Sequence, residues 1–327
     1  MLLSGGVSLM AAAEAAEVRV YSGRHYNTDR DVFKRFSDQT GIRVRLLEST
    51  GLSLVERLKR EGARSKADVI ILVDAARINQ AADAGLLQPV RSATLDRAVP
   101  ATYRDPSGRW YGLTRRVRSI IVNPDKVSPG TIRTYQDLAS PKLKGQLCLR
   151  KRSSVYNQSL VADQILLRGQ GATRSWLNGI TRNVTQPYYG NDVALVRAVA
   201  SGRCGVGVVN HYYVARMRGG VQGKRDQTVA RKVEVIMPKP AHVNISAAGV
   251  AKTARNKTEA IRLIEFLASP DGNKGLAGPT YEYPLRGSGS SAELRRLGSF
   301  TPDNVPIAKL ARTQPTALKM MAEAGWK

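Results

Sequence analysis

The run Val69-Ile70-Ile71-Leu72-Val73 is the clearest indication of fold class in this 327-residue chain. Five consecutive apolar residues, most of them β-branched, are typical of a fully buried strand. Two similar strands are expected upstream, at residues 18–21 and 42–46. Helices are expected between and after these strands, at residues 28–41, 54–62 and 75–84. This βαβαβα order predicts parallel strands with right-handed crossovers, and therefore a doubly wound α/β unit.

The alternation stops at residues 109–122, a long extended stretch that is expected to carry the chain into a second lobe. Strands are then expected at residues 145–149, 204–209 and 233–237, with helices at 156–167, 173–180, 192–201 and 213–218. A second extended stretch, residues 243–251, returns the chain to the first lobe. The predicted lobes are residues 17–114 plus 243–285 and residues 115–242 plus 286–327, each a doubly wound mixed sheet. Two lobes joined by two extended crossings describe a hinged clamp.

The first sixteen residues are expected to lie outside this fold. They are apolar and small, and they end in Ala11-Ala12-Ala13-Glu14-Ala15-Ala16, which resembles the end of a secretory signal. The basic segment that usually opens such a signal is missing. We therefore expect residues 1–16 to be the remnant of an export signal.

The charge balance is strongly basic, with 51 Lys and Arg against 26 Asp and Glu and a net charge of +25. Such a charge raises the question of nucleic acid or an anionic membrane as partner. The basic residues are spread over nearly every expected helix, without a basic tail or an aromatic and basic motif. We therefore expect no nucleic-acid partner, but a weak attraction to anionic membrane surfaces. No apolar run is long enough to span a bilayer.

The chain contains two cysteines, Cys148 and Cys204, and each lies in a strand-like run just upstream of a tyrosine-bearing turn. Neighbouring strands could bring them within bonding distance. Such a bridge would persist in an oxidising compartment. Two separate buried thiols are the alternative that the sequence leaves open.

Three tyrosine-bearing turns carry the candidate chemistry: Arg24-His25-Tyr26-Asn27, Val155-Tyr156-Asn157-Gln158-Ser159 and Asn210-His211-Tyr212-Tyr213. Each turn follows a strand-like run and precedes a helix, and such junctions line one crevice in an open α/β sheet. A phenol, with a pKa of about 10, binds metal well only when a hard, strongly Lewis-acidic cation displaces its proton. Ferric iron meets this requirement, whereas softer metals prefer thiolates or several imidazoles.

Arginines could offset the surplus negative charge of four phenolates around a trivalent ion. Strand alternation places Arg116 and Arg118 on one face and Arg115 on the other. Arg216 lies one turn beyond Tyr212 on a helix. Taken singly, each arginine is more often a solvated charge, and each tyrosine a packed ring.

Other residues of the same types complicate this pattern. Tyr188 and Tyr189 occupy a similar junction, and the pattern alone does not exclude them. His211 and His242 are expected to be surface histidines.

A family resemblance rests on the motifs Ser22-Gly23-Arg24-His25-Tyr26-Asn27-Thr28-Asp29, Val155-Tyr156-Asn157-Gln158-Ser159-Leu160 and His211-Tyr212-Tyr213. Residues 190–192, 242–246 and 323–327 add to it in the same order along the chain. Together they resemble the periplasmic ferric-iron-binding proteins of cyanobacterial and related iron ABC importers. The resemblance implies a class II periplasmic binding fold.

The resemblance also implies a ligand set. A ferric ion (Fe3+) would be held by Tyr26, Tyr156, Tyr212 and Tyr213, with His25 as fifth ligand in some members of the family. Arg116 and, less closely, Arg216 match arginines that neighbour the iron, whereas Tyr188 and Tyr189 match no ligand position. His211 replaces a small polar residue, which leaves open an extra histidine near the metal.

The implied function is a periplasmic receptor, monomeric and without catalytic activity, that delivers ferric iron to an inner-membrane ABC permease. The same scaffold could instead bind sulfate, phosphate or a carboxylate chelate through Arg116, Arg118 and helix N-termini. A nucleic-acid or membrane-surface protein would rest on net charge alone. A metalloenzyme is disfavoured, because redox and hydrolytic iron sites keep open positions and use histidine and carboxylate ligands.

Overall fold

The computed structural model describes residues 16–24 and 26–327. Its strands are β1 (Glu17–Ser22), β2 (Arg43–Glu48), β3 (Val69–Val73), β4 (Tyr111–Val122), β5 (Leu147–Cys148), β6 (Val206–Asn210), β7 (Glu234–Ile236), β8 (Val243–Val250) and β9 (Tyr283–Pro284). Its helices are α1 (Asp29–Thr40), α2 (Gly51–Glu61), α3 (Ala75–Asp83), α4 (Ala93–Ala98), α5 (Val155–Asn183), α6 (Asp192–Ala200), α7 (His211–Arg218), α8 (Lys224–Arg231), α9 (Lys257–Ala268), α10 (Pro270–Thr280), α11 (Ala292–Arg296) and α12 (Leu310–Glu323).

The strands follow one path in the order β2-β1-β3-β8-β4-β6-β5, with β7 and β9 also paired to β4. Strand β1 is parallel to both β2 and β3, as predicted. Strand β8 runs antiparallel to β3, and β5 runs parallel to β6. Parallel and antiparallel pairs therefore occur in both parts of the molecule, and the predicted mixed α/β architecture is confirmed.

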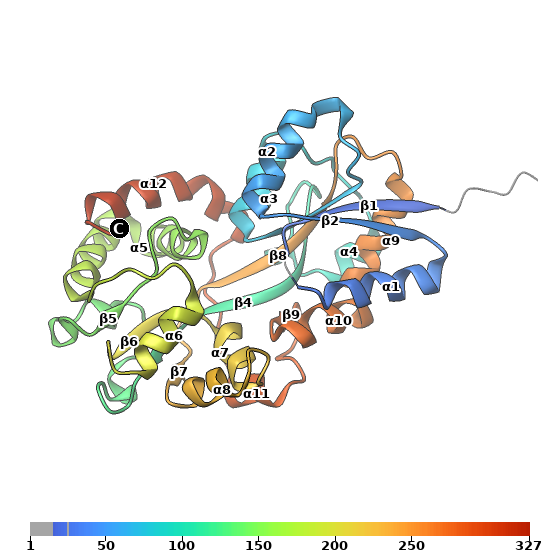
Figure 1. Ribbon diagram of the computed structural model, residues 1–327. Helices are drawn as coiled ribbons and strands as arrows, with labels where there is room; N and C mark the ends of the chain where they lie inside the picture. Colours follow the sequence, from blue (N-terminus) through green and yellow to red (C-terminus); the bar gives the residue numbers. More distant parts are fainter. Residues whose placement is uncertain (1–15, 25) are drawn as a thin grey trace, which may run out of the picture.

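Two lobes are visible in Figure 1, with β4 and β8 running between them. The first part of β4 pairs with β8, and Arg116 lies opposite Asn244. The second part pairs with β6, and Arg118 lies opposite Asn210. Strand β4 therefore changes partners between two consecutive inward-facing arginines, and both arginines lie where the lobes meet.

Helices cover both faces of each sheet, which is the doubly wound arrangement. Val69 and Ile71 of β3 pack in a core with α1 and α9, while Ile70 and Leu72 pack in a second core with α2 and α3. All five residues of β3 are buried. Alternate side chains of β3 therefore point to opposite faces of the sheet and pack into two separate cores, as expected for a fully apolar strand.

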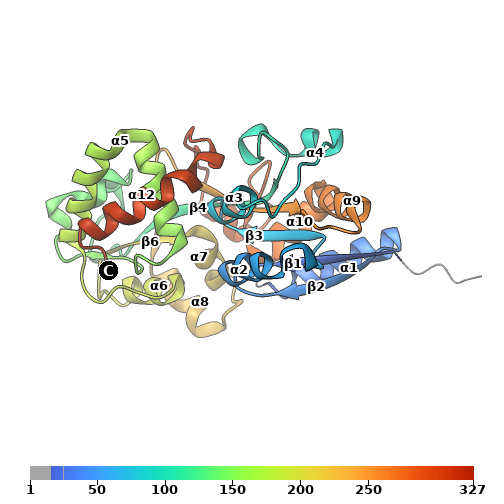
Figure 2. The same cartoon turned by 90° about the horizontal axis from the view of Figure 1, so that it is seen from above.

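Two helices were expected within residues 156–180, and the structure joins them into α5 with a break at Gly169. The φ angle of Gly169 is 78°, which a residue without Cβ adopts easily. Helix α12 packs along α5 and also contacts α3, and Figure 2 shows it crossing α5. The C-terminal helix therefore touches elements of both lobes.

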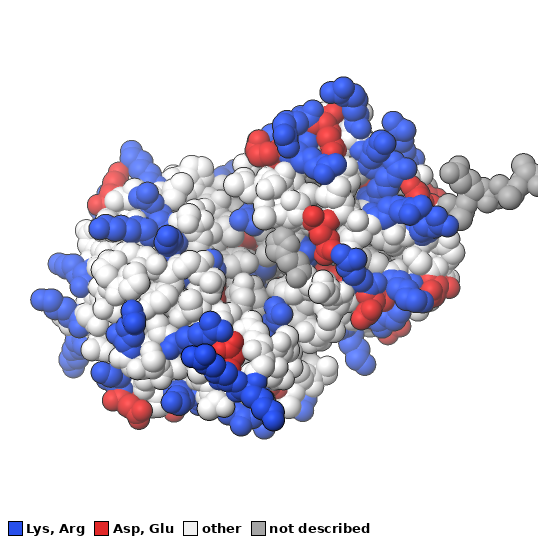
Figure 3. All heavy atoms as spheres, viewed as in Figure 1, with Lys and Arg blue, Asp and Glu red and all other residues white. Residues whose placement is uncertain are grey.

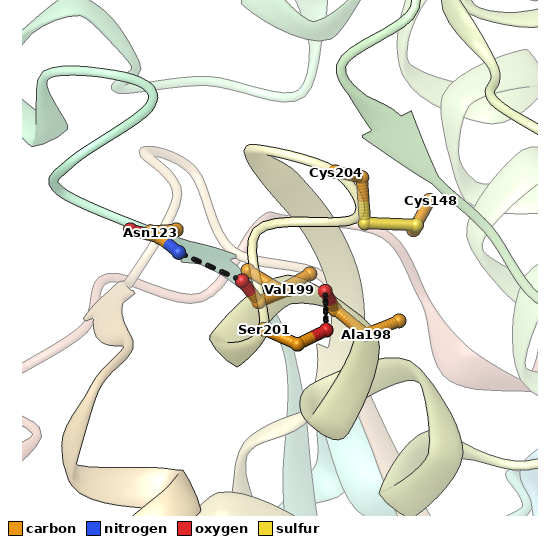
Figure 4. Close-up of a disulfide and its surroundings, with 6 residues drawn as sticks. All are labelled: Asn123, Cys148, Ala198, Val199, Ser201 and Cys204. Carbon is orange, nitrogen blue, oxygen red and sulfur yellow. Dashed lines mark hydrogen bonds between the residues drawn. A yellow bond between two sulfur atoms is a disulfide. The ribbon is translucent and has the colours of Figure 1, made fainter.

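The two cysteines form a disulfide, with a Cα–Cα distance of 5.9 Å. The bond joins the end of β5 to the loop before β6, and both side chains are fully buried (Figure 4). Nearby, the Asn123 amide donates to the Val199 carbonyl at 3.0 Å and holds the end of α6. The alternative of two free thiols is thereby excluded, and the bond suits an oxidising compartment.

The expected export-signal remnant, residues 1–16, lies outside the described residues except for Ala16. In the part of the chain that the structure describes, no helix combines the length and the apolar character that a membrane crossing requires. Figure 3 shows lysines and arginines scattered over both lobes of the visible face, with acidic residues among them. This spread agrees with the prediction that the basic residues are distributed over the whole surface.

Replacing both cysteines by serine should lower the free energy of unfolding by about 3 kcal/mol, because the bond closes a long loop in the unfolded chain. The two cysteines are 56 residues apart in sequence. Urea unfolding of the double Cys148→Ser, Cys204→Ser variant against the wild-type protein measures the change. Equal midpoints with equal slopes would contradict a stabilising bond.

Candidate metal centre

The three tyrosine-bearing turns lie at the strand-to-helix junctions where they were predicted. Tyr26 is in the loop between β1 and α1, Tyr156 is in the first turn of α5, and Tyr212 and Tyr213 are in the first turn of α7. Tyr212 is buried, and the other three side chains are partly buried. Tyr26 comes from one lobe and the other three tyrosines from the opposite lobe.

The structure brings all four phenols together. The rings of Tyr212 and Tyr213 are 4.4 Å apart at their centroids. Burial raises the pKa of Tyr212 well above its ordinary value, and the nearby phenols of Tyr156, Tyr213 and Tyr26 raise it further. Burial likewise raises the pKa of Tyr26, with Glu282, Tyr156 and Tyr213 adding to the effect. Without a cation, the hydroxyl groups of Tyr26 and Tyr212 therefore keep their protons at neutral pH.

Five guanidinium groups surround these rings. Arg24 and Arg216 lie over the ring of Tyr26, at 4.9 and 5.3 Å from its centroid. The ring of Tyr156 has three such neighbours, at 5.4 to 5.9 Å: Arg150, Arg116 and Arg118. Because Arg216 is on α7 and Tyr26 is in the β1–α1 loop, this contact crosses from one lobe to the other.

A buried ionic frame holds the guanidinium of Arg24 in place. Its Nε donates to Asp29 at 2.7 Å, and its Nη1 donates to Glu282 at 2.8 Å. Glu282 also lies 3.6 Å from Nη1 of Arg116. Burial alone would raise the pKa of Glu282, but Arg24 and Arg116 outweigh burial and hold the pKa below its usual value. Glu282 therefore stays ionised and anchors two cations beside the phenols.

A second frame holds the arginines on the other side of Tyr156. Arg118 donates to Asp192 at 2.6 Å and to the side chain of Asn157 at 2.7 Å. Arg150 pairs with the other oxygen of Asp192. Arg116 and Arg118 were predicted to share one face of their strand, and their common contact with Tyr156 confirms it. Both are buried, so the alternative of a solvated strand edge is wrong.

His211 was expected at the surface, and this expectation is wrong because the residue is fully buried. The backbone N–H of Val117 donates to Nδ1 at 3.1 Å, which leaves the proton on Nε2, 3.0 Å from the Tyr281 carbonyl. Burial lowers the pKa of His211 to about 4. Both ring nitrogens are occupied by the backbone, so His211 ties α7 to β4 and is not an extra metal ligand.

His242 was also expected at the surface, and it is 2% exposed. It lies just before β8, where the chain passes between lobes, and sequence alone gave no sign of its burial. His25, the predicted fifth ligand, lies outside the described residues. Tyr188 belongs to a hydrophobic core, and Tyr189 packs beside a different one. Neither is among the main groups that shift the pKa of Tyr26, Tyr212 or Tyr213.

Several functional candidates were missed by sequence reasoning. Arg24 was quoted only as part of a motif, although it is fully buried beside Tyr26. Glu282 precedes β9 in a short segment without periodicity, so nothing local indicated its role. Arg150 and Asp192 are far apart in sequence and meet only in the fold. Long-range ion pairs of this kind leave no spacing signal.

The fold and the cleft define a two-lobed binding protein of class II. The model of the family described as bacterial extracellular solute-binding protein matches residues 64–300, and the chain belongs to this family. It is 40% identical to iron uptake protein A1 of Synechocystis over 96% of this chain and 88% of that one. It is 30% identical to the major ferric iron-binding protein of Neisseria meningitidis over 95% and 91% of the two chains.

A solved structure agrees with this assignment. A Trichodesmium protein, IdiA or FutA, in complex with iron and citrate superimposes with a TM-score of 0.92 at 40% identity. The match covers 95% of this chain and all of the other. The two-lobed class II fold that the resemblance implied is therefore confirmed.

The ionic frame around Glu282 supports a test of stability. Glu282→Gln should lower the free energy of unfolding by about 3 kcal/mol, because it leaves buried arginines without their counter-charge. The loss should shrink as pH falls below 4.5, the ordinary pKa of glutamate, because the depressed pKa of Glu282 contributes stability only while the carboxylate is ionised.

Glu56→Gln is the matched control, because Glu56 pairs with Lys59 at 3.0 Å on the exposed surface of α2. This change should alter the free energy of unfolding by less than about 0.5 kcal/mol. Urea unfolding at neutral and acidic pH measures both variants. Losses of similar size in the two variants would show that the buried frame has no special importance.

Proposed function

We propose that this protein is a periplasmic receptor that captures ferric iron between its lobes and delivers it to an inner-membrane ABC permease. The observation that carries the proposal is the meeting of four phenols from both lobes among five arginines. Phenols are hard oxygen donors, and a trivalent cation is the ligand that displaces their protons at neutral pH. The names of the relatives, iron uptake protein and ferric iron-binding protein, support the same ligand.

In this proposal Tyr26, Tyr156, Tyr212 and Tyr213 bind the ion. His25 is the proposed fifth ligand, carried over from the family resemblance. The arginines offset the surplus charge, since four phenolates and one trivalent ion sum to a single negative charge. Arg116 and Arg216 are the arginines proposed to lie next to the ion. Arg116 contacts the ring of Tyr156, and Arg216 contacts the ring of Tyr26.

The lobes are proposed to comprise residues 17–114 plus 243–285 and residues 115–242 plus 286–327. Tyr26 then belongs to the first lobe and the other three ligands to the second. Iron held by both sides favours the closed form, because only that form makes all the bonds. The closed form, as a monomer, would dock on the permease, and its positive surface would add a weak attraction to anionic lipid.

A second candidate is an anion or carboxylate chelate, and one observation favours it. Nε and Nη1 of Arg116 and Nε of Arg118 are buried and have no hydrogen-bond partner among residues 16–24 and 26–327. Both arginines line a small cavity together with Tyr156 and Asn210. A carboxylate could accept from these donors, either alone or beside the metal.

Colour separates the two candidates. The purified protein mixed with ferric nitrilotriacetate should develop a visible phenolate-to-iron charge-transfer band, whereas a receptor for the anion alone would stay colourless. Tyr213→Phe should weaken or shift the band and lower iron affinity by at least about tenfold, since one charged ligand is lost. Absorbance titration measures both effects.

Tyr189→Phe is the matched control, because the Tyr189 hydroxyl is buried without a hydrogen-bond partner and lies outside the phenol cluster. Its band and affinity should equal those of the wild-type protein. Equal losses in Tyr189→Phe and Tyr213→Phe would contradict the ligand assignment.

Closure should depend on the ligand from the first lobe. Tyr26→Phe removes the only proposed phenolate of that lobe, so iron should still reach the second lobe without drawing the lobes together. Small-angle X-ray scattering with and without iron measures the radius of gyration. The wild-type protein should become more compact on binding iron. Compaction of the Tyr26→Phe variant to the same extent would refute the proposal that Tyr26 is needed for closure.

A further inference from the structure

Three ionisable side chains meet in the interior, and one of them, His242, also lines the small cavity beside Tyr156 and Arg116. Asp163 is on α5, His242 directly precedes β8, and Asp303 lies between α11 and α12. Nδ1 of His242 is 3.2 Å from Oδ1 of Asp163 and 3.9 Å from Oδ2 of Asp303. The exposed fraction of the side chain is 3% for His242, 1% for Asp163 and 6% for Asp303. One ligand atom from each residue lies within 4.8 Å of the other two.

The atoms that face one another make no hydrogen bonds within the described part of the chain. Oδ1 of Asp163, Oδ2 of Asp303 and Nδ1 of His242 are all buried there without a partner, although two of them are only 3.2 Å apart. The remaining carboxylate oxygens are held from outside the cluster. Gln164 donates to Oδ2 of Asp163 at 3.1 Å, and the backbone of Val305 donates to Oδ1 of Asp303 at 3.0 Å. Such outer contacts orient metal ligands in proteins.

The cluster has no lysine or arginine partner: within residues 16–24 and 26–327, neither residue type forms an ion pair with Asp163 or Asp303. Asp163 and Asp303 outweigh burial and raise the pKa of His242, and burial raises the pKa of Asp303 to about 7, so protons offset the charge when no metal is bound. A divalent cation between the three atoms would replace those protons and satisfy each atom.

We propose that Asp163, His242 and Asp303 form a second metal site, for a divalent first-row transition-metal ion such as zinc. One imidazole and two carboxylates are borderline to hard donors that suit zinc. Bond lengths of about 2.1 Å in a tetrahedral shell separate ligand atoms by about 3.4 Å. The observed 3.2 Å is close to this separation, whereas Oδ2 of Asp303, 3.9 Å from the imidazole, would have to move inward on binding.

This metal would be a resident structural ion, because the site is buried. It would join three segments at the crossing between lobes: helix α5, the start of β8 and the C-terminal return of the chain. A backbone bond already links the last two, since the N–H of Asp303 donates to the Ala241 carbonyl at 3.0 Å. The N–H of Arg118 on β4 donates to the His242 carbonyl at 3.1 Å. The ion would therefore fix the position from which β8 enters the hinge.

Zinc retention by the full-length protein tests the site. The protein is saturated with zinc chloride, passed through gel filtration and assayed for metal, and zinc-edge X-ray absorption gives the neighbouring atoms. We expect about one retained zinc ion per chain, with nitrogen and oxygen neighbours that include one imidazole. Asp303→Asn should weaken zinc binding at least about tenfold.

Two controls keep this result apart from the ferric site. The double Tyr26→Phe, Tyr213→Phe variant should retain zinc like the wild-type protein, whatever it does to iron. Asp38→Asn, which removes an exposed carboxylate from α1, should also retain it. The proposal is overturned by no retained zinc, by zinc neighbours without imidazole, or by loss in the double tyrosine variant. If Asp303→Asn fails to fold, the X-ray absorption of the wild-type protein decides alone.

Discussion

Charged guanidinium groups are buried beside four phenols, and the arrangement of the site follows from the need to compensate their charge. Arg24, Arg116 and Arg118 are 0 to 2% exposed, and each would be unstable in the interior without an anion. Glu282, Asp29 and Asp192 supply part of that negative charge. The arginines in turn prepare the cleft for phenolates, which are the anions that a hard cation would create there.

Strand β4 is the element that makes this arrangement possible. Its inward-facing residues include both Arg116 and Arg118, and it changes partner from β8 to β6 between them. One strand therefore carries cations to both lobes at a fixed spacing. His211 holds α7 against the same strand through Val117, so the paired tyrosines of α7 are fixed relative to these arginines. The proposed second metal would fix β8, the other crossing strand, in a similar way.

Much of the architecture follows from local patterns. The alternation of β3 between two cores and the apolar face of α1 were readable in the chain, as were the three tyrosine junctions, because each depends on residues close in sequence. The burial of His211 and His242 was not readable, since a lone histidine carries no periodic signal. The ion pairs of Glu282 join residues as much as 258 positions apart, and only the fold reveals them.

Diffraction at the iron absorption edge from crystals of the iron-loaded protein would locate the bound metal. We expect one strong anomalous peak within bonding distance of the hydroxyl oxygens of Tyr26, Tyr156, Tyr212 and Tyr213. A peak elsewhere in the molecule, or one that these four oxygens do not share, would contradict it.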